Sequence, residues 1–536
     1  MATNDRGQHD EAIDPPVMSR RDVLKGALLV AATPLIGGAV VAACSSGAKP
    51  RSSPPTTSTL PPSAARTVDP AQFMSVAQLT DWHHELDAMG MRATGSAVHE
   101  RYIDQLHDRL ARAGVGSLRE EPVSIDRWTT ASWALEIPDG PHRGAITTAS
   151  YMPYSGSTPP RGVDGALAFV DSAQPVARGS LAGKIVVFDV PVSALTYATM
   201  KVVAYDTYDP AHMLDPQARY DRPWAGISAL ITFLDALGES GAAAVVGVID
   251  LPAAGAHGSY YPYDGNIRRV PGVFVDAPTG QRLKTLAALG TNARLTLPAQ
   301  VERTTTRNIV GVIPGRSDEI VILNSHTDGP NAVEDNGPNA IVAMSQYLTR
   351  LPRAALPRSV MVVMTTGHFH GGVGQVDFVA AHRESTLPKT ACALTLEHFG
   401  ALEWQADASG EMALTGKPEL GVVFVPENRA MVDASLRALQ RSQSAPAMVL
   451  HPYVADAQSP SGYGWPGEGT QLWTDGHVPT ANYITGPTYL LNWGVSTVGK
   501  CDIARMRRET IAFMQMMLDL GQVSFADLHA LDLKGL

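Results

Sequence analysis

The chain has 536 residues, which is too long for one hydrophobic core and indicates two or more folded units. Hydrophobic residues make up 44% of it and charged residues 18%, as is typical of a globular protein with a sizeable core. The formal net charge is -10 and no block of basic residues occurs, which argues against nucleic acid as a partner.

The N-terminus carries features of an export signal. Residues 1–43 resemble a twin-arginine signal, because Arg20 and Arg21 precede an apolar stretch that is broken by Pro34 and followed by Cys44 in a lipobox-like context. A membrane-spanning helix is the alternative, but the apolar run is short, rich in small residues and interrupted by proline. We therefore expect a cell-envelope lipoprotein on the extracytoplasmic face, held at the membrane by a lipid on Cys44.

Residues 44–67 are rich in Ser, Thr and Pro and lack periodic apolar positions, so they are predicted to form a disordered tether. Two cysteines follow in the body, Cys392 and Cys501. In an exported protein they are candidates for a disulfide, and two buried thiols are the alternative.

The folded body begins with helical patterning. Apolar spacing of three and four residues predicts helices over residues 76–89 and 97–113, and a strand follows near residues 133–137. From about residue 139 to 299 the residue pattern changes to short apolar runs separated by glycine and proline. This pattern predicts a separate β-rich module with a few helices.

A cluster of polar residues follows an apolar run in the second half of the chain. The run at residues 319–323 predicts a short buried strand, and the sequence from Asn339 has helical spacing. Between them lie His326, Asp328 and Asp335, in the loop where a strand of an α/β sheet would end. Ligands commonly bind in such crevices, so this loop is predicted to begin a metal site.

The middle module resembles a known accessory domain. Its segments 183–187, 241–246 and 270–275 look like those of a protease-associated domain. The resemblance implies that residues 139–299 are an insertion into a larger catalytic domain.

The sequence on both sides of this module resembles the zinc aminopeptidase family that includes bacterial leucyl aminopeptidases and the vacuolar aminopeptidase Y. Residues 92–96 resemble the segment before the first helix of that family, and residues 308–315 resemble the strand that re-enters the catalytic sheet. The resemblance implies an α/β fold, with a zinc-exopeptidase-like mixed sheet flanked by helices, formed by residues 68–138 and 300–536.

Several residues match the metal ligands of the family. His326 corresponds to its first histidine ligand, Asp328 to the carboxylate that orients this histidine, and Asp335 to an aspartate that bridges two zinc ions. Glu397 corresponds to the next acidic ligand, with His398 beside it. The resemblance thus implies a site in which zinc is bound by His326, Asp335 and Glu397.

Other positions depart from the family pattern. Where the family has two adjacent glutamates, a general base and a ligand of the second zinc, this chain has His368 and Phe369. No histidine occurs near residue 490, where the family has its last ligand. We therefore expect one zinc ion with His368 as the general base, since imidazole titrates near neutral pH.

A second ion is an alternative that the sequence leaves open. His368 and His370 are two residues apart and would point the same way in an extended segment, so His370 could complete a second site with His398. By contrast, Glu468 is expected to be a solvated loop residue.

The function expected from these residues is metal-dependent hydrolysis of a peptide or amide bond, with a peptide as substrate. Two alternatives remain: a catalytically inactive lipoprotein that binds peptide or a partner, and a glutaminyl-cyclase-like transferase that uses a single zinc.

Overall fold

The computed structural model describes residues 59–193, 195–454 and 463–533. The predicted signal of residues 1–43 and the predicted lipidation site Cys44 lie outside the described residues. Within the described ranges, no helix has both the length and the apolar character needed to cross a membrane.

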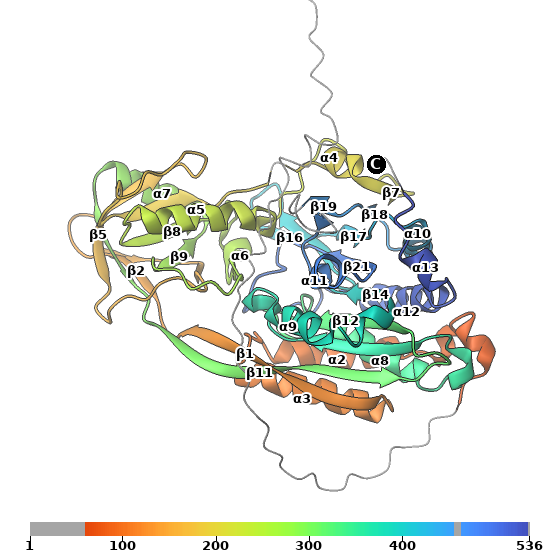
Figure 1. Ribbon diagram of the computed structural model, residues 1–536. Coiled ribbons are helices and arrows are strands. Elements are labelled where there is room, and N and C mark those ends of the chain that lie inside the picture. The colour runs from red at the N-terminus through yellow and green to blue at the C-terminus, as the bar shows by residue number, and fades with distance from the viewer. Residues whose placement is uncertain (1–58, 194, 455–462, 534–536) are drawn as a thin grey trace, which may run out of the picture.

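Most strands of the described residues belong to two sheets, which Figure 1 shows side by side in the two halves of the molecule. The larger, nine-stranded sheet is mixed, with parallel strands at its centre and antiparallel strands at its edges. Its order is β1 (Gly116–Thr130), β11 (Ala299–Ile313), β13 (Ser359–Thr365), β12 (Ile320–His326), β14 (Thr390–Leu396), β21 (Thr480–Thr485), β17 (Gly421–Phe424), β18 (Ala447–Leu450) and β7 (Ala204–Tyr208).

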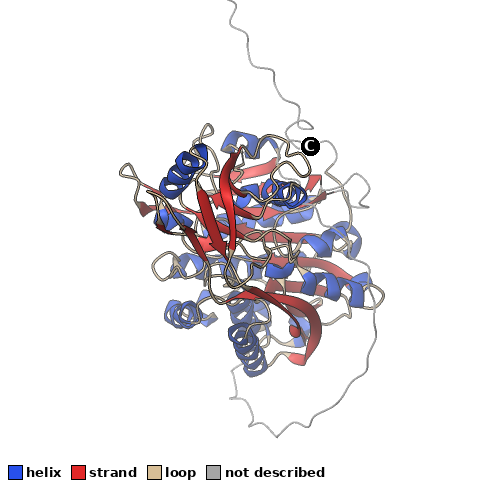
Figure 2. Cartoon of the chain, turned by 90° about the vertical axis from the view of Figure 1, so that its left-hand side faces the viewer, coloured by secondary structure: helices blue, strands red, loops and turns tan. Residues whose placement is uncertain are grey.

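Helices cover both faces of the larger sheet, so that strands form the inner layer (Figure 2). In β12, Val321 and Leu323 pack in the main core on one face while Ile322 packs on the other, which explains the continuous apolar run of this strand. The first face is covered by α2 (Val76–Ala88), α3 (Ala97–Arg112), α8 (Gly337–Leu348), α10 (Arg429–Ser442) and α12 (Ile503–Leu520), and the second by α9 (Val373–His382) and α11 (Thr470–Thr474).

The predicted helices at the start of the body are confirmed. Ser75 begins α2 with a capping box that it shares with Gln78, and Ser96 caps α3. α3 buries Tyr102, Leu106 and further residues at helical spacing, because its apolar stripe faces α8 and the sheet.

The inserted module contains the second, eight-stranded sheet. Its central strands β5, β6, β8 and β9 are parallel, and helices cover its two faces. The order is β3 (Gly144–Ile146), β2 (Ala134–Ile137), β10 (Asn292–Thr296), β5 (Val163–Val170), β6 (Ile185–Asp189), β8 (Ala244–Val248), β9 (Gly272–Val275) and β4 (Ser150–Tyr151), with α5 (Ile227–Glu239) on one face and α7 (Ala277–Ala288) on the other.

The module boundaries differ from those predicted at residues 139 and 299. β2 precedes residue 139 but pairs with β10 and β3 inside the module. β7 lies within the predicted module, yet it pairs with β18 and forms an edge of the larger sheet. The insertion therefore also supplies an edge strand of the larger sheet, a pairing that sequence spacing does not reveal.

Two further predictions need correction. The predicted tether of residues 44–67 extends too far, because Leu60, Ala64 and Ala65 are buried against the body. Cys392 and Cys501 are both buried and both free, so the disulfide alternative is wrong and the alternative of two buried thiols is correct.

The inserted module is attached to the larger domain through aromatic packing around Trp493. The Trp493 ring lies 5.9 Å from the ring of Tyr151 and 6.0 Å from that of Trp133, both residues of the module. Its indole N–H donates to the Ser150 hydroxyl at 3.1 Å, and its backbone N–H donates to the Gly258 carbonyl at 2.8 Å. Trp493 thus contributes both ring packing and hydrogen bonds to the contact between the two units.

Replacing this tryptophan should loosen the module. We expect Trp493→Ala to cost about 2 kcal/mol, since the indole is half-buried and its aromatic neighbours would lose their partner. Hydrogen exchange should accelerate at the backbone N–H of Tyr260, which donates to Leu491. Trp82→Ala, at a half-buried tryptophan of α2, is the matched control, and equal acceleration in both variants would contradict the assignment.

Candidate active site

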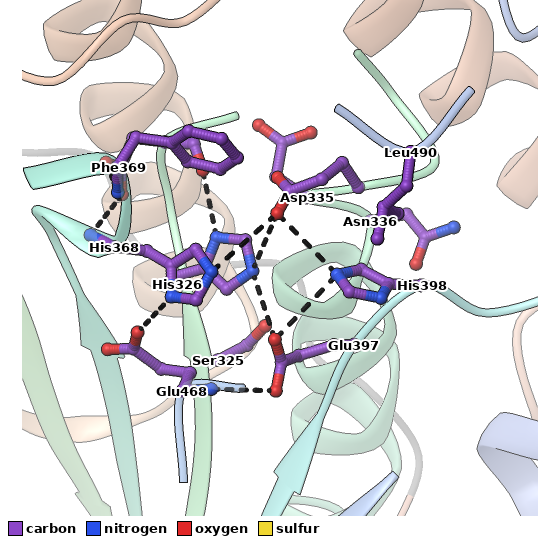
Figure 3. A network of polar contacts seen from close by, with 12 residues as sticks. Ser325, His326, Asp335, Asn336, His368, Phe369, Glu397, His398, Glu468 and Leu490 are labelled. Carbon is purple, nitrogen blue, oxygen red and sulfur yellow. Dashed lines mark hydrogen bonds and ion pairs between the residues drawn. The ribbon is translucent and has the colours of Figure 1, made fainter. Parts of the chain in front are cut away.

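Three neighbouring parallel strands end at one edge of the larger sheet and supply the polar residues of the site. β12 ends at His326, β13 leads into the short helix η5 (His368–His370), and β14 leads into Glu397 and His398. Figure 3 shows the side chains of His326, Glu397 and His398 turned toward one another. The carboxyl edge of the strands is therefore the candidate site, as expected for an open α/β sheet.

His326 is fully buried, and its own loop fixes its orientation. Its Nδ1 donates to the backbone carbonyl of Asp328 at 2.9 Å, and because a carbonyl can only accept, the lone pair is left on Nε2. This Nε2 lies 3.4 Å from Glu397 Oε2 and 3.6 Å from Glu334 Oε1.

His398 is oriented in the same manner from the next strand. Its backbone has the left-handed φ of 55°, which turns the side chain into the site. Its Nδ1 donates to the Thr485 carbonyl at 2.7 Å, so that Nε2 again presents a lone pair. That Nε2 lies 3.6 Å from Glu334 Oε1 and 3.8 Å from Glu397 Oε2.

Glu334 is a site residue that the sequence analysis missed. Its side chain is 1% exposed and lies between the two histidines, whereas the family resemblance directed attention to its neighbour Asp335. Space for it depends on Gly329, where a Cβ atom would overlap Glu334 Oε2. The only sequence signal was a second carboxylate beside the expected one.

Asp335 is turned away from this cluster and toward Arg92. The guanidinium Nε lies 2.5 Å from Asp335 Oδ2, its Nη2 lies 2.7 Å from Oδ1, and both side chains are completely buried. The two carboxylate oxygens are thus held by one arginine. Glu334, and not the predicted Asp335, accompanies His326 and Glu397.

Asp328 holds the loops of the site together in a different way from the one predicted. Its backbone carbonyl, and not its carboxylate, orients His326. The carboxylate accepts the backbone N–H of His368 at 3.2 Å, that of Phe369 at 2.9 Å and the hydroxyl of Thr94 at 2.6 Å. These bonds fix η5 beside β12.

His368 forms a dyad with Glu468 at the edge of the cluster. Its Nδ1 lies 2.7 Å from Glu468 Oε2, and the hydroxyl of Thr365 donates to the other oxygen of this glutamate. The His368 ring stacks on that of His326 with centroids 4.2 Å apart, and its Nε2 lies 4.0 Å from Glu334 Oε1. Glu468 is 1% exposed, so the expectation of a solvated loop residue is wrong.

The remaining candidate, His370, lies outside the cluster. Because η5 is helical and not extended, His370 points away from His368 and its ring faces Tyr154 of the module at 5.4 Å. Phe369 and Leu490, at the positions where the family has ligands, are buried in the apolar cluster of the module. The structure therefore does not bring His370 and His398 together.

Burial and the close packing of charged groups shift the pKa values of the cluster strongly, and they shift those of its two glutamates in opposite directions. Burial raises the pKa of Glu334 to about 7. Burial opposes ionisation of His326, but the carboxylates of Glu334 and Glu397 outweigh it and raise the pKa of His326 well above its usual value. Burial likewise opposes the charge of Glu397, yet the nearby imidazoles of His326, His398 and His368 lower the pKa of Glu397 to about 2. Such a cluster is suited to a shared cation.

The donor atoms have the spacing of a metal site. Ligand atoms of His326, Glu397 and His398 lie within 4.8 Å of one another, and so do those of His326, Glu334 and His368. A tetrahedral zinc with ligands at about 2.0–2.1 Å separates them by about 3.4 Å, close to the 3.4–3.8 Å found between the two neighbouring histidines and the two glutamates. Within the described part of the chain, Nε2 of His326 and of His398 and one oxygen each of Glu334 and Glu397 have no hydrogen-bond partner. The residues therefore fit a metal ion.

Comparison with known proteins finds two curated sequences that are similar to part of the chain. No family model matches the chain. Human carboxypeptidase Q is 22% identical over 310 residues, which cover 56% of this chain and 60% of that protein, and bovine carboxypeptidase Q is 22% identical over 313 residues. The chain thus matches about 60% of the length of these curated relatives.

Solved structures resemble a larger part of the chain. A peptidase M28 precursor from Shewanella amazonensis has a TM-score of 0.59 at 16% identity and covers 86% of this chain and 95% of its own. A zinc aminopeptidase from Bacillus subtilis has a TM-score of 0.56 at 14% identity and covers 82% of this chain and 94% of its own. At such identities the likeness concerns the fold alone, and the fold of this chain is the mixed α/β fold of these peptidases.

Proposed function

We propose that the protein is a metal-dependent peptidase that holds one zinc ion between His326, Glu397 and His398, with Glu334 as a fourth donor. The observation that carries this proposal is the set of buried, unpartnered nitrogen and oxygen atoms at the strand ends. The likeness of the fold to zinc aminopeptidases supports the same reaction class.

A single ion accounts best for the donor atoms. The second group of possible ligands consists of His326, Glu334 and His368, so it shares His326 and Glu334 with the proposed zinc site and adds only His368. Asp335 is bound on both oxygens by Arg92. Few donors therefore remain for a second ion.

When bound, zinc would supply Lewis-acid polarisation of the peptide carbonyl and of the attacking water. The residues of the chain have separate tasks. His368 carries a proton on Nδ1, where Glu468 accepts it, so its Nε2 is free to take a proton from the attacking water. The Glu468 carboxylate stabilises the resulting imidazolium, which then returns a proton to the leaving amine.

Metal content tests the ligand assignment directly. We expect about one zinc per chain in the purified protein, and His326→Ala or His398→Ala should weaken zinc binding at least about 100-fold, because even indirect partners of a ligand cost 10–100-fold. His370→Ala is the matched control and should keep its zinc. A protein without stoichiometric metal, or one whose zinc survives both ligand substitutions, would overturn the proposal.

The role of His368 has its own test. His368→Gln should lower kcat for peptide hydrolysis about 10²–10⁴-fold at unchanged zinc content, because glutamine cannot accept the proton. His370→Gln should keep wild-type kinetics, since this histidine faces Tyr154. Wild-type turnover in His368→Gln would remove it as the base. Conversion of an N-terminal glutamine into a pyroglutamyl residue that stays on the peptide, with release of ammonia, would instead favour the glutaminyl-cyclase-like alternative.

We also propose that the protein is exported and anchored through Cys44, on the strength of Arg20, Arg21 and the lipobox-like context in the sequence. In cells fed radiolabelled palmitate, the full-length chain should become labelled and sediment with membranes. Cys44→Ala should abolish the label, whereas Cys501→Ala, at a buried thiol, should keep it. Equal labelling of both variants would exclude this anchor.

A further inference from the structure

A loop of the inserted module lies directly on the turn that carries His368. The backbone N–H of Gly371 donates to the Tyr263 carbonyl at 3.0 Å, and the Tyr154 hydroxyl donates to the Phe369 carbonyl. The approach is so close that a Cβ atom at Gly371 would lie 2.6 Å from the Asp264 carbonyl oxygen. The module therefore forms one wall of the active site.

Tyr263 is the residue of this loop that faces the catalytic dyad. Its ring lies 5.5 Å from the ring of His368, tilted by 31°, and 4.9 Å from that of Phe369. The side chain is half-buried, and its hydroxyl has no hydrogen-bond partner among the described residues. A phenol fixed by its ring beside a catalytic base thus keeps its O–H group available.

The electrostatic surroundings of this hydroxyl agree with its position. Burial, followed by the nearby charges of Glu334, Glu397 and Glu468, raises the pKa of Tyr263 above its ordinary value. The phenol therefore stays protonated at neutral pH and can donate a hydrogen bond. Under the proposed function Glu334 and Glu397 bind the metal ion, and Glu468 accepts from His368, so the natural acceptor for this donor is a bound ligand.

We propose that the Tyr263 hydroxyl donates a hydrogen bond to the carbonyl oxygen of the scissile bond as this oxygen gains negative charge. This inference rests on the proposed peptidase function. Donors aimed at the position of a developing oxyanion, in a site that excludes water, contribute strongly to acyl-transfer reactions. The inserted module would then supply a catalytic residue, and the larger domain alone would have an incomplete site.

Tyr263→Phe tests the proposal, since it removes only the hydroxyl and keeps the stacked ring. The assay uses the zinc-loaded full-length enzyme and the substrate that it cleaves fastest in a panel of aminoacyl and dipeptidyl p-nitroanilides. We expect kcat to fall about 10²-fold with little change in KM and none in zinc content. Tyr261→Phe is the matched control, because the Tyr261 hydroxyl is buried in the module without a hydrogen-bond partner.

A binding measurement provides a readout that is independent of turnover. A phosphinic analogue of the same substrate has tetrahedral geometry and an anionic oxygen, so Tyr263→Phe should weaken its binding at least tenfold while binding of the cleavage product stays unchanged. Equal values of kcat and of analogue affinity in Tyr263→Phe and wild type would overturn the inference and leave the peptidase proposal intact. A wild-type protein that binds zinc but neither cleaves the panel nor binds the analogue would overturn both.

Discussion

The structure of the site depends on hydrogen bonds that fix three histidines through the same ring nitrogen. His326 and His398 donate from Nδ1 to backbone carbonyls, and His368 donates from Nδ1 to Glu468. In each case the acceptor determines where the proton lies, and the Nε2 lone pair is directed into the cluster. Because backbone carbonyls at strand ends do not move independently of the sheet, the donor atoms are arranged before any ligand arrives.

Apolar residues next to the cluster connect the turn that carries His368 to the inserted module. Phe369 and Leu490 are buried with residues of the inserted module, and Phe369 also contacts Tyr260 and Tyr263. The turn carrying His368 is thus fixed by hydrogen bonds to Asp328 and by packing against the module. Removal of the module would expose this apolar surface and release the turn, so the position of His368 depends on both units.

Much of this arrangement was predictable from the sequence. The apolar run before His326 and the helical spacing after it predicted β12 and α8, and the strand-end position predicted the site, because local periodicity decides these elements. The sequence could not identify Glu334 and Glu468 as site residues in the same way. Glu334 stands beside the equally acidic Asp335, and Glu468 lies between two glycines in a segment without apolar periodicity. Only the folded chain shows which carboxylate enters the cluster and which one faces Arg92.

The sequence by itself determined the α/β pattern, the strand that ends at His326 and the residue types available for metal binding. The tertiary structure decided which of these residues enter the site and which pair elsewhere, for a physical reason. A buried carboxylate must be neutralised by whatever lies beside it, and the partners come from distant segments: Arg92 for Asp335, His368 for Glu468, and His398 with His326 for Glu334. The same holds for the module, whose Tyr263 is far from His368 along the chain although the two rings lie 5.5 Å apart in the fold.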